Sequence, residues 1–331
     1  MTTPGVTATG LVKAFGDLRA VDGIDLEVRQ GEIFGVLGPN GAGKTTMLRM
    51  LATLLPIDAG KAFVFGVDVA REPHRIRQLV GVTGQYASVD EDLTATENLW
   101  LFGRLQGLRS ADARATAADL LTQFGLEEAA NKPIAQFSGG MRRRLDLAAS
   151  LITRPPLIFL DEPTTGLDPR TRGQMWDTIR GLVAAGCTIM LTTQYLDEAD
   201  QLADRIAVID HGRKVAEGTA DELKTSVGNS TLQLQLADGA DADLARQVVW
   251  RVTGREPVLT PESARLNVPL DTADAAADVL IALRQASLAI ASVNVSKPTL
   301  DEVFLALTGH DAGDEDQSDL SSTDEQYVEA R

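Results

Sequence analysis

A short glycine-rich stretch has the residue types and spacing of a loop that binds phosphate. It reads Gly38-Pro39-Asn40-Gly41-Ala42-Gly43-Lys44-Thr45-Thr46 and fits the pattern G-x-x-x-x-G-K-[ST]. Glycines let backbone N–H groups turn toward a phosphate, and a helix N-terminus adds partial positive charge. Lys44 should then reach the β- and γ-phosphates of ATP, while the Thr45 hydroxyl binds Mg²⁺. A glycine-rich turn without a ligand is the competing interpretation.

Two adjacent carboxylates, Asp161 and Glu162, follow the apolar run Leu157–Leu160. Such a pair costs electrostatic repulsion unless a cation and a catalytic task offset it. Asp161 is placed to hold Mg²⁺ through a water molecule, and Glu162 is the candidate general base for the water that attacks the γ-phosphate. A strand that simply ends in solvated acids is the alternative.

The elements that must position these groups alternate between short apolar runs and helical patterns. The runs Ile33–Leu37, Leu157–Leu160, Thr188–Thr192 and Ile206–Ile209 are apolar almost throughout, which suits strands covered on both faces. The glycine-rich loop follows the first of them and precedes a helical pattern over Thr45–Leu54. This alternation predicts an α/β fold with a parallel sheet.

The pattern changes after Gly228, where the order of elements becomes βαββαβ. This order predicts a smaller α+β domain with the ferredoxin-like plan. The capping-box spacing from Thr219 to Glu222 predicts a helix that closes the region before it. The last amphipathic stretch, Leu300–Leu307, suits core packing or a dimer contact better than catalysis. The expected strands are Thr231–Leu236, Pro257–Thr260, Arg265–Leu270 and Leu288–Val295, and the expected helices are Asp241–Thr253 and Thr272–Ala286.

The net charge of −16 is concentrated toward the C-terminus, since residues 311–331 hold eight acids and one base. That segment is polar and short, so we expect a disordered acidic tail. The predicted organisation is therefore a nucleotide-binding domain at 1–220, an accessory domain at 221–310 and the tail. The acidity argues against a nucleic-acid partner, because phosphate contacts need clustered Lys and Arg.

The sequence also bears on the compartment. Cys187 is the only cysteine, and no apolar run approaches the roughly 18 residues that a membrane-spanning helix needs. We therefore expect a chain in a reducing cytoplasm that does not cross a membrane by itself. The three histidines show no paired spacing, so no structural metal site is expected.

Phe137-Ser138-Gly139-Gly140-Met141 resembles the signature motif of ATP-binding cassette (ABC) proteins, whose commonest form has Gln at the position of Met141. The order of the loop, Gln85, this motif, the acid pair and Asp168 matches that family over roughly residues 5–220. The resemblance implies a RecA-like core with an antiparallel β subdomain and a helical subdomain. It also implies a head-to-tail homodimer in which Ser138, Gly139, Gly140 and Asp168 complete the ATP site of the partner. A helix cap at Ser138 and a turn-forming role for Asp168 remain alternatives.

The resemblance assigns three further residues. Phe15 resembles the aromatic that stacks on adenine, although a core position is almost equally compatible with its type. Gln85 resembles the glutamine that touches Mg²⁺ and reports the nucleotide to the membrane partner. Gln194 stands where the family usually has a histidine near the γ-phosphate, and because Gln cannot carry a proton to or from the reaction, we expect slower hydrolysis.

The C-terminal stretch from Pro298 to Gly309 extends the resemblance to the ATP-binding subunits of daunorubicin/doxorubicin-resistance exporters. This implies an ATPase that energises export of hydrophobic drugs or related complex lipids through a separate membrane permease. The chain would then lie at the cytoplasmic face of the membrane, bound to that permease. Leu93, Leu99, Trp100, Leu101 and Phe102 form either its docking groove or a domain core.

Two other functions compete with export. An importer ATPase could use the C-terminal domain to bind a regulatory ligand. A soluble ABC ATPase that acts on nucleic acid is disfavoured by the single cassette and by the lack of a basic patch.

Overall fold

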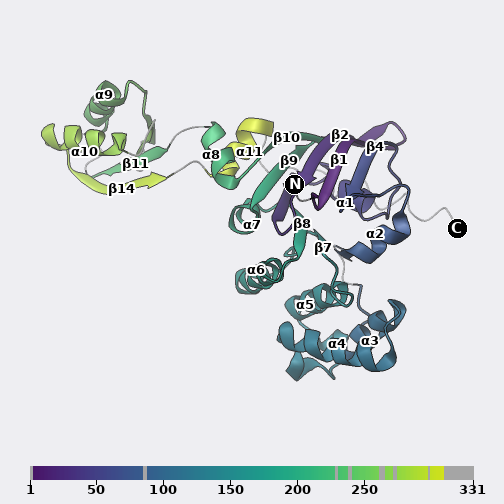
Figure 1. The fold of residues 1–331 in the computed structure, drawn as a ribbon. Coiled ribbons are helices and arrows are strands. Elements are labelled where there is room, and N and C mark those ends of the chain that lie inside the picture. Colours follow the sequence, from purple (N-terminus) through teal and green to yellow (C-terminus); the bar gives the residue numbers. More distant parts are fainter. Residues whose placement is uncertain are drawn as a thin grey trace, which may run out of the picture. The chain divides into compact units, whose positions relative to one another are not determined.

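The computed structural model describes residues 3–84, 88–227, 230–237, 241–260, 265–270, 274–296 and 299–308. These residues form two compact units, which divide after Thr219 (Figure 1). The predicted acidic tail at 311–331 lies outside the described residues, as does Gln85.

A six-stranded sheet forms the centre of the first unit, with the order β10-β9-β3-β8-β7-β6. Strands β9, β3, β8, β7 and β6 run parallel, and β10 is antiparallel to β9. The apolar runs singled out in the sequence all lie in this sheet, so the predicted parallel α/β core is confirmed. Its strands are β3 (Ile33–Leu37), β6 (Val80–Thr83), β7 (Leu157–Asp161), β8 (Thr188–Thr193), β9 (Arg205–Asp210) and β10 (Arg213–Gly218).

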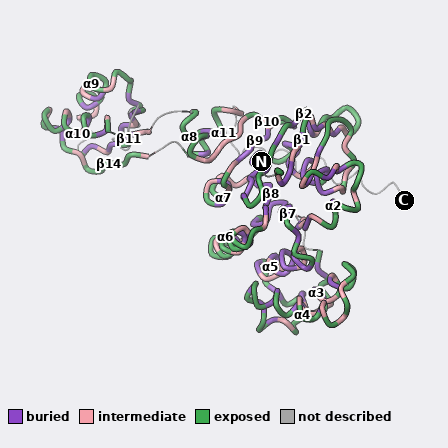
Figure 2. Tube along the Cα trace, in the orientation of Figure 1, coloured by how far each residue is buried: buried purple, intermediate pink, exposed green. Residues whose placement is uncertain are grey.

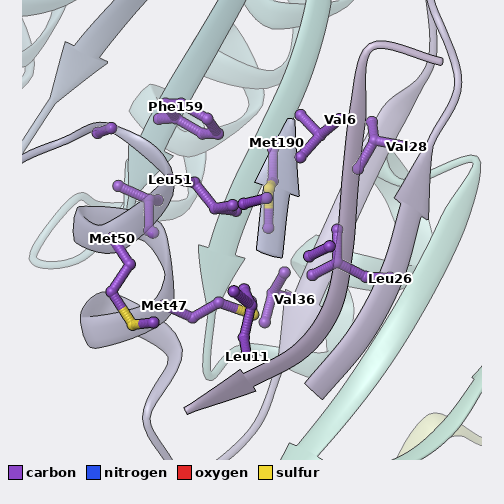
Figure 3. Packing of buried hydrophobic residues seen from close by; sticks show 14 of the residues in the cluster. Val6, Leu11, Leu26, Val28, Val36, Met47, Met50, Leu51, Phe159 and Met190 are labelled. Atoms are coloured by element: carbon purple, nitrogen blue, oxygen red, sulfur yellow. The ribbon is translucent and has the colours of Figure 1, made fainter. Parts of the chain in front are cut away.

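A second, antiparallel sheet in the same unit has the order β2-β1-β4-β5. Helix α1 (Lys44–Leu51) packs between this sheet and one face of the parallel sheet, as Figure 3 shows. Met47, Met50 and Leu51 of α1 are fully buried in this cluster. The strands are β1 (Val6–Phe15), β2 (Leu18–Val28), β4 (Ala59–Val64) and β5 (Val67–Asp68).

Helices cover the opposite face of the parallel sheet. A second cluster of buried apolar side chains lies between these helices and the sheet, and it includes Ile158 and Leu160 of β7. Phe159, which lies between them in the sequence, packs on the other face in the cluster that contains α1. This alternation explains why the strand is apolar at every position, and Figure 2 shows β7 and β8 as buried. The helices of the unit after α1 are α2 (Pro73–Leu79), α3 (Ala95–Leu105), α4 (Ser110–Gln123), η1 (Glu127–Ala129), η2 (Ile134–Gln136), α5 (Gly139–Ser150), α6 (Pro169–Ala184) and α7 (Leu196–Leu202). Among the described residues, no helix has the length and apolar content to span a membrane.

The second unit has the predicted βαββαβ order, and its sheet has the order β12-β13-β11-β14. Buried side chains of α9 and α10 pack with those of β11 and β13 to form its core. The elements are β11 (Thr231–Leu236), α9 (Ala242–Thr253), β12 (Val258–Thr260), β13 (Arg265–Pro269), α10 (Ala275–Gln285) and β14 (Ile290–Ser296).

The helix predicted to begin after Thr219 is present, but it belongs to the second unit and does not close the first. Helix α8 (Ala220–Val227) packs against α11 (Leu300–Thr308), where Leu223 and Phe304 are both buried. The apolar side of α8 is therefore covered by a helix far away in the sequence. The same contact buries Leu300 and Val303, which favours core packing over a dimer contact for this stretch.

The packing of α1 predicts a large difference between two neighbouring leucines. Leu51 is fully buried, whereas Leu54 is 58% exposed. Leu51→Ala should lower the free energy of unfolding by about 2 to 5 kcal/mol, since it leaves a cavity between the two sheets. Leu54→Ala should change it by less than about 0.5 kcal/mol. Urea titrations followed by circular dichroism measure both, and equal losses would contradict this account of the core.

Candidate nucleotide-binding and hydrolysis site

The parallel sheet brings the predicted site residues to one edge. The register pairs Leu37 with Thr193 and Asp161 with Thr192, so β3, β7 and β8 end side by side. The glycine-rich loop follows β3, and Asp161 and Glu162 stand at the end of β7. Ligands of open α/β sheets bind outside these carboxyl ends, which is where the sequence placed its candidates.

Two glycines allow the loop to lie close to neighbouring backbone. A Cβ at Gly43 would overlap the carbonyl oxygen of Ala20, and one at Gly38 would overlap that of Ile209. Gly43 also has φ of 97°, which L side chains rarely adopt. Asn40 and Gly41 are exposed at the tip of the loop, so a phosphate can approach their backbone. Pro39 and Ala42 are buried, and Thr46 is half-buried on α1.

Lys44 lies inside this loop and is only 4% exposed. Its Nζ donates to the carbonyl oxygens of Gly38 at 2.7 Å and Pro39 at 2.8 Å, and it lies 3.9 Å from Oε1 of Glu162. Burial lowers the pKa of Lys44, although the carboxylates of Glu162 and Asp161 act in the opposite direction. An anionic phosphate at the loop would further favour the charged ammonium.

Oxygen donors gather around Asp161. Its Oδ1 accepts from the hydroxyl of Thr45 at 2.8 Å and from that of Thr192 at 2.6 Å. A hydroxyl and a carboxylate are the ligand types that Mg²⁺ prefers, and the ion usually completes its shell with water and substrate phosphates. The described residues contain no group of three or more His, Cys, Asp or Glu side chains that could hold a metal. The residues present therefore fit Mg²⁺ held jointly with a nucleotide.

Glu162 has a strained backbone next to this cluster. Its φ is 49°, a left-handed value that costs a non-glycine residue about 1 to 3 kcal/mol. Its N–H donates to the carbonyl and hydroxyl oxygens of Thr192, and its Oε2 accepts from the Thr165 hydroxyl at 3.3 Å. The surrounding structure holds the carboxylate, 7% exposed, beside Lys44.

The signature residues and Asp168 lie near each other on two helix starts. Ser138 caps α5 by accepting from the N–H of Met141, and Asp168 caps α6 by accepting from the N–H groups of Arg170 and Thr171. The Thr171 hydroxyl, which donates to Asp168 at 2.6 Å, also lowers the pKa of that carboxyl. The helix cap given as the alternative for Ser138 is thus present, and Asp168 caps a helix where a turn-forming role was the alternative. Gly139 is exposed, while Gly140 lies close against Thr171. The role of this group toward a partner stays a prediction.

Three candidates remain, which are Phe15, Gln194 and Gln85. Phe15 is 49% exposed at the end of β1, which excludes the core interpretation and leaves its ring accessible. The ammonium of Lys13 lies 5.6 Å from the ring centroid. Gln194 is half-buried immediately after β8, at the same sheet edge as Glu162. Gln85 lies outside the described residues, just after Gly84.

Two buried ionisable residues of this edge were not singled out from the sequence. Arg143 on α5 is 8% exposed, and Glu198 on α7 is fully buried. A signal existed for Arg143, because it shares the helical spacing of the buried Gly140 and Leu147 and therefore had to face inward. Glu198 stands in a polar helix start, where an acid is expected on the surface, so nothing marked it.

A P-loop at the end of a parallel strand, with an acid pair at the end of the next strand but one in the same sheet, defines the class of P-loop nucleoside triphosphatases. The ABC transporter family matches residues 21–165, and the family described as ATP-binding protein DrrA1-3-like, C-terminal domain, matches residues 218–308.

Curated relatives extend over both units. The chain is 53% identical to the daunorubicin/doxorubicin resistance ATP-binding protein DrrA of Streptomyces peucetius, over 98% of each chain. It is 44% identical to a doxorubicin resistance ATP-binding protein of Mycobacterium tuberculosis, over 92% of this chain and 93% of the relative. It is 38% identical to the Nod factor export ATP-binding protein I of Rhizobium sp. strain N33, over 94% and 99%.

Solved structures resemble the first unit. An ATP-binding cassette in an ADP conformation covers 67% of this chain and 93% of its own, with a TM-score of 0.62 at 24% identity, which shows the fold. A dimeric cassette bound to ADP and Pi covers 65% and 98%, with a TM-score of 0.60 at 26% identity. The chain belongs to the ATP-binding proteins of ABC transporters, on the DrrA-like branch, and it is an ATP-hydrolysing enzyme that binds nucleotide.

From the buried carboxyl of Glu198 we expect the free energy of unfolding to depend on pH. Burial raises its pKa above the usual value of 4.5, although hydrogen bonds, including those from Thr164 at 2.8 Å and Trp176 at 3.2 Å, act in the opposite direction. Between 4.5 and the raised pKa, the folded state binds more protons than the unfolded state, so stability falls as pH rises through this window.

Glu198→Gln removes this titration and keeps an oxygen acceptor for both donors. The stability of the wild type relative to Glu198→Gln should therefore be greatest below pH 4.5 and fall as pH rises, as measured by urea unfolding from pH 4 to 8. Glu128→Gln, on the surface, is the control and should follow the wild type at each pH. A difference that stays constant with pH would contradict the assignment.

Proposed function

We propose that the chain is the ATP-hydrolysing subunit of an ABC exporter that moves hydrophobic drugs of the anthracycline type, or related complex lipids, through a separate permease. One observation carries this proposal: the similarity to drug-resistance and export ATP-binding proteins spans both units, including the C-terminal family at residues 218–308. The names of these relatives favour export over import. The C-terminal unit is then an accessory part of an export subunit, beside a nucleotide-binding domain.

The proposed mechanism begins with binding of ATP at the sheet edge. Phe15 offers its exposed ring to the adenine, the backbone of Gly38 to Thr46 surrounds the phosphates, and Lys44 pairs with the β- and γ-phosphates. Thr45, Gln85 and, through water, Asp161 would hold Mg²⁺, which supplies positive charge between the phosphate groups. Glu162 accepts a proton from the attacking water, and Gln194 donates a hydrogen bond near the γ-phosphate.

We further propose a head-to-tail homodimer. Ser138 and Asp168 lie on two helix starts that are in contact through Gly140 and Thr171, so they form one surface. Exposed N–H groups at a helix start favour an anion. In the dimer this surface would complete the ATP site of the partner, and the similar dimeric cassette with ADP and Pi supports such an arrangement.

The permease partner is proposed to dock on the first unit, which would place the chain at the cytoplasmic face of the membrane. A pocket of about 250 Å³ lies between α3, α5 and β6, with Phe102, Ser88 and Asp146 among its lining residues. Of the predicted groove residues, Leu99 is fully buried in the core, whereas Leu101 is exposed and Phe102 lines the pocket. A side chain from a permease helix fits a hollow of this size and mixed polarity.

Replacing Glu162 tests the mechanism and the transport function together. Glu162→Gln should lower ATP turnover by about 10² to 10⁴ fold, because a neutral amide cannot take the proton from water. ATP binding and dimerisation should persist, since the phosphate loop is untouched. The measurements are phosphate release, binding of a fluorescent ATP analogue and light scattering.

In vesicles that also hold the permease, ATP-driven efflux of doxorubicin should stop with Glu162→Gln. Lys44→Met is the contrasting variant and should weaken ATP binding itself. Normal turnover in Glu162→Gln would remove this residue as the base, and wild-type vesicles that hydrolyse ATP without moving drug would remove the proposed cargo.

Gln194→His tests the effect of the residue after β8. The imidazole can hold and release a proton near neutral pH, so turnover should rise by up to about tenfold. The rise should depend on pH with an inflection near that of histidine, which phosphate release between pH 5.5 and 8.5 measures. Gln174→His, on the outer side of α6, is the control and should leave the profile unchanged. An unchanged rate in Gln194→His would show that this position does not limit hydrolysis.

A further inference from the structure

A single buried arginine contacts the backbone on both sides of Glu162. Arg143 of α5 donates from Nη2 to the carbonyl oxygens of Asp161 at 3.0 Å and Glu162 at 2.8 Å, and from Nε to that of Pro163 at 2.9 Å. Its Nη1 donates to the carbonyl oxygen of Gly84 at 2.7 Å. One planar guanidinium thus binds three consecutive carbonyls and a fourth from Gly84, the residue after β6.

This contact bears directly on the strain at Glu162. The carbonyl oxygens of Asp161 and Glu162 belong to the peptide planes before and after the Glu162 Cα, so together they define its φ and ψ. At φ of 49° the residue would relax if these planes were free to rotate. The rigid fork of Arg143 fixes both planes, and it therefore fixes the direction in which the Glu162 side chain leaves the backbone.

Burying this cation is costly unless the chain compensates it. Burial lowers the pKa of Arg143, and the nearby carboxylates of Asp146, Asp161, Glu198 and Glu162 oppose that shift. The four hydrogen bonds to carbonyl oxygens satisfy most of its donors. Such an arrangement orders backbone that the apolar core alone would not hold.

The same helix also contacts Ser88, the first described residue after Gln85. Asp146 stands one turn after Arg143, is 4% exposed, and its Oδ1 accepts from the N–H of Ser88 at 2.7 Å. Gly84 and Ser88 are the described residues on either side of Gln85, and each is bonded to α5. Asp146 and Ser88 line the pocket in which we place the permease.

We propose that Arg143 is a positioning residue that holds the Glu162 backbone in its reactive conformation and ties it to Gly84 just after β6. The inference rests on the proposed role of Glu162. A purely stabilising role for Arg143 would give a different result. Replacing the residue would then lower thermal stability and weaken ATP binding and turnover alike.

The first test compares Arg143→Gln and Arg143→Lys in the full-length chain, with Arg144→Gln as the matched control. Arg144 follows on the same helix and donates to the carbonyl oxygen of Phe124, just after α4 and away from Glu162. Arg143→Gln should lower kcat by about 10² fold, the scale of a small misplacement of a reacting group, with the Kd for ATP little changed. Arg143→Lys should recover part of the loss, because an ammonium can still bind some of the carbonyls.

The control Arg144→Gln should keep the kcat of the wild type. Equal falls in kcat in the Arg143→Gln and Arg144→Gln variants, or a thermal midpoint that falls in proportion to kcat across the set, would overturn the inference in favour of a stabilising role.

A double-mutant cycle with Glu162→Gln separates this inference from the proposed function. If Arg143 acts through Glu162, adding Arg143→Gln to Glu162→Gln should cause no further loss of residual turnover. Additive losses would overturn the inference while leaving Glu162 as the base. If Glu162→Gln alone keeps turnover, the proposed mechanism fails instead, and the inference fails with it.

Hydrogen exchange tests the tie between the two segments. In Arg143→Gln, amide exchange should rise both at residues 80–84 and around residues 159–166, whereas Arg144→Gln should leave both unchanged. A rise confined to one of the two segments would overturn the coupling.

Discussion

The side-by-side ends of three parallel strands are the constraint on which this site depends. Because Asp161 pairs with Thr192 and Leu37 with Thr193, the Thr192 hydroxyl bonds both to Asp161 and to the N–H of Glu162. A slip of one residue in β7 would turn Asp161 to the other face and move Glu162 away from Lys44. The two apolar clusters oppose such a slip, since Phe159 and its neighbours Ile158 and Leu160 are fully buried on opposite faces.

Local charge at the site differs from the charge of the chain. The net charge is −16, and much of it belongs to residues 311–331, which hold eight acids and one base. At the sheet edge, the carboxylates of Asp161 and Glu162 lie close to two buried cations, Lys44 and Arg143, so protein groups largely balance one another there. A nucleotide would add negative charge, which the loop N–H groups and the proposed Mg²⁺ would offset.

The sequence predicted those strands and site residues that are determined by residues close to them in the chain. Apolar runs located the strands β3, β7, β8 and β9, and the loop motif located Lys44 and Thr45, because burial on both faces and a phosphate turn each restrict residue types directly. Contacts between a side chain and backbone atoms produce no such pattern in the sequence. The carbonyls that Arg143 binds exist in every sequence, and the close approach of Gly43 to Ala20 depends on how strand β2 of the antiparallel sheet packs against the loop. Helix α8 was misassigned for the same reason, since its partner α11 is remote in the chain.

Helix α5 carries two positions that serve different ATP sites in the proposed dimer. Its N-terminus carries Ser138 at a surface suited to a phosphate of the partner, and one turn and a half later Arg143 holds the carbonyls around Glu162 of its own chain. A rigid helix moves as a unit, so closure of the proposed dimer on Ser138 would also shift the guanidinium of Arg143 and the contact of Asp146 with Ser88. In that dimer the two ATP sites would not be arranged independently. Hydrolysis in one chain would then be linked both to the partner's nucleotide and to the pocket proposed for the permease, because all three contacts belong to one helix.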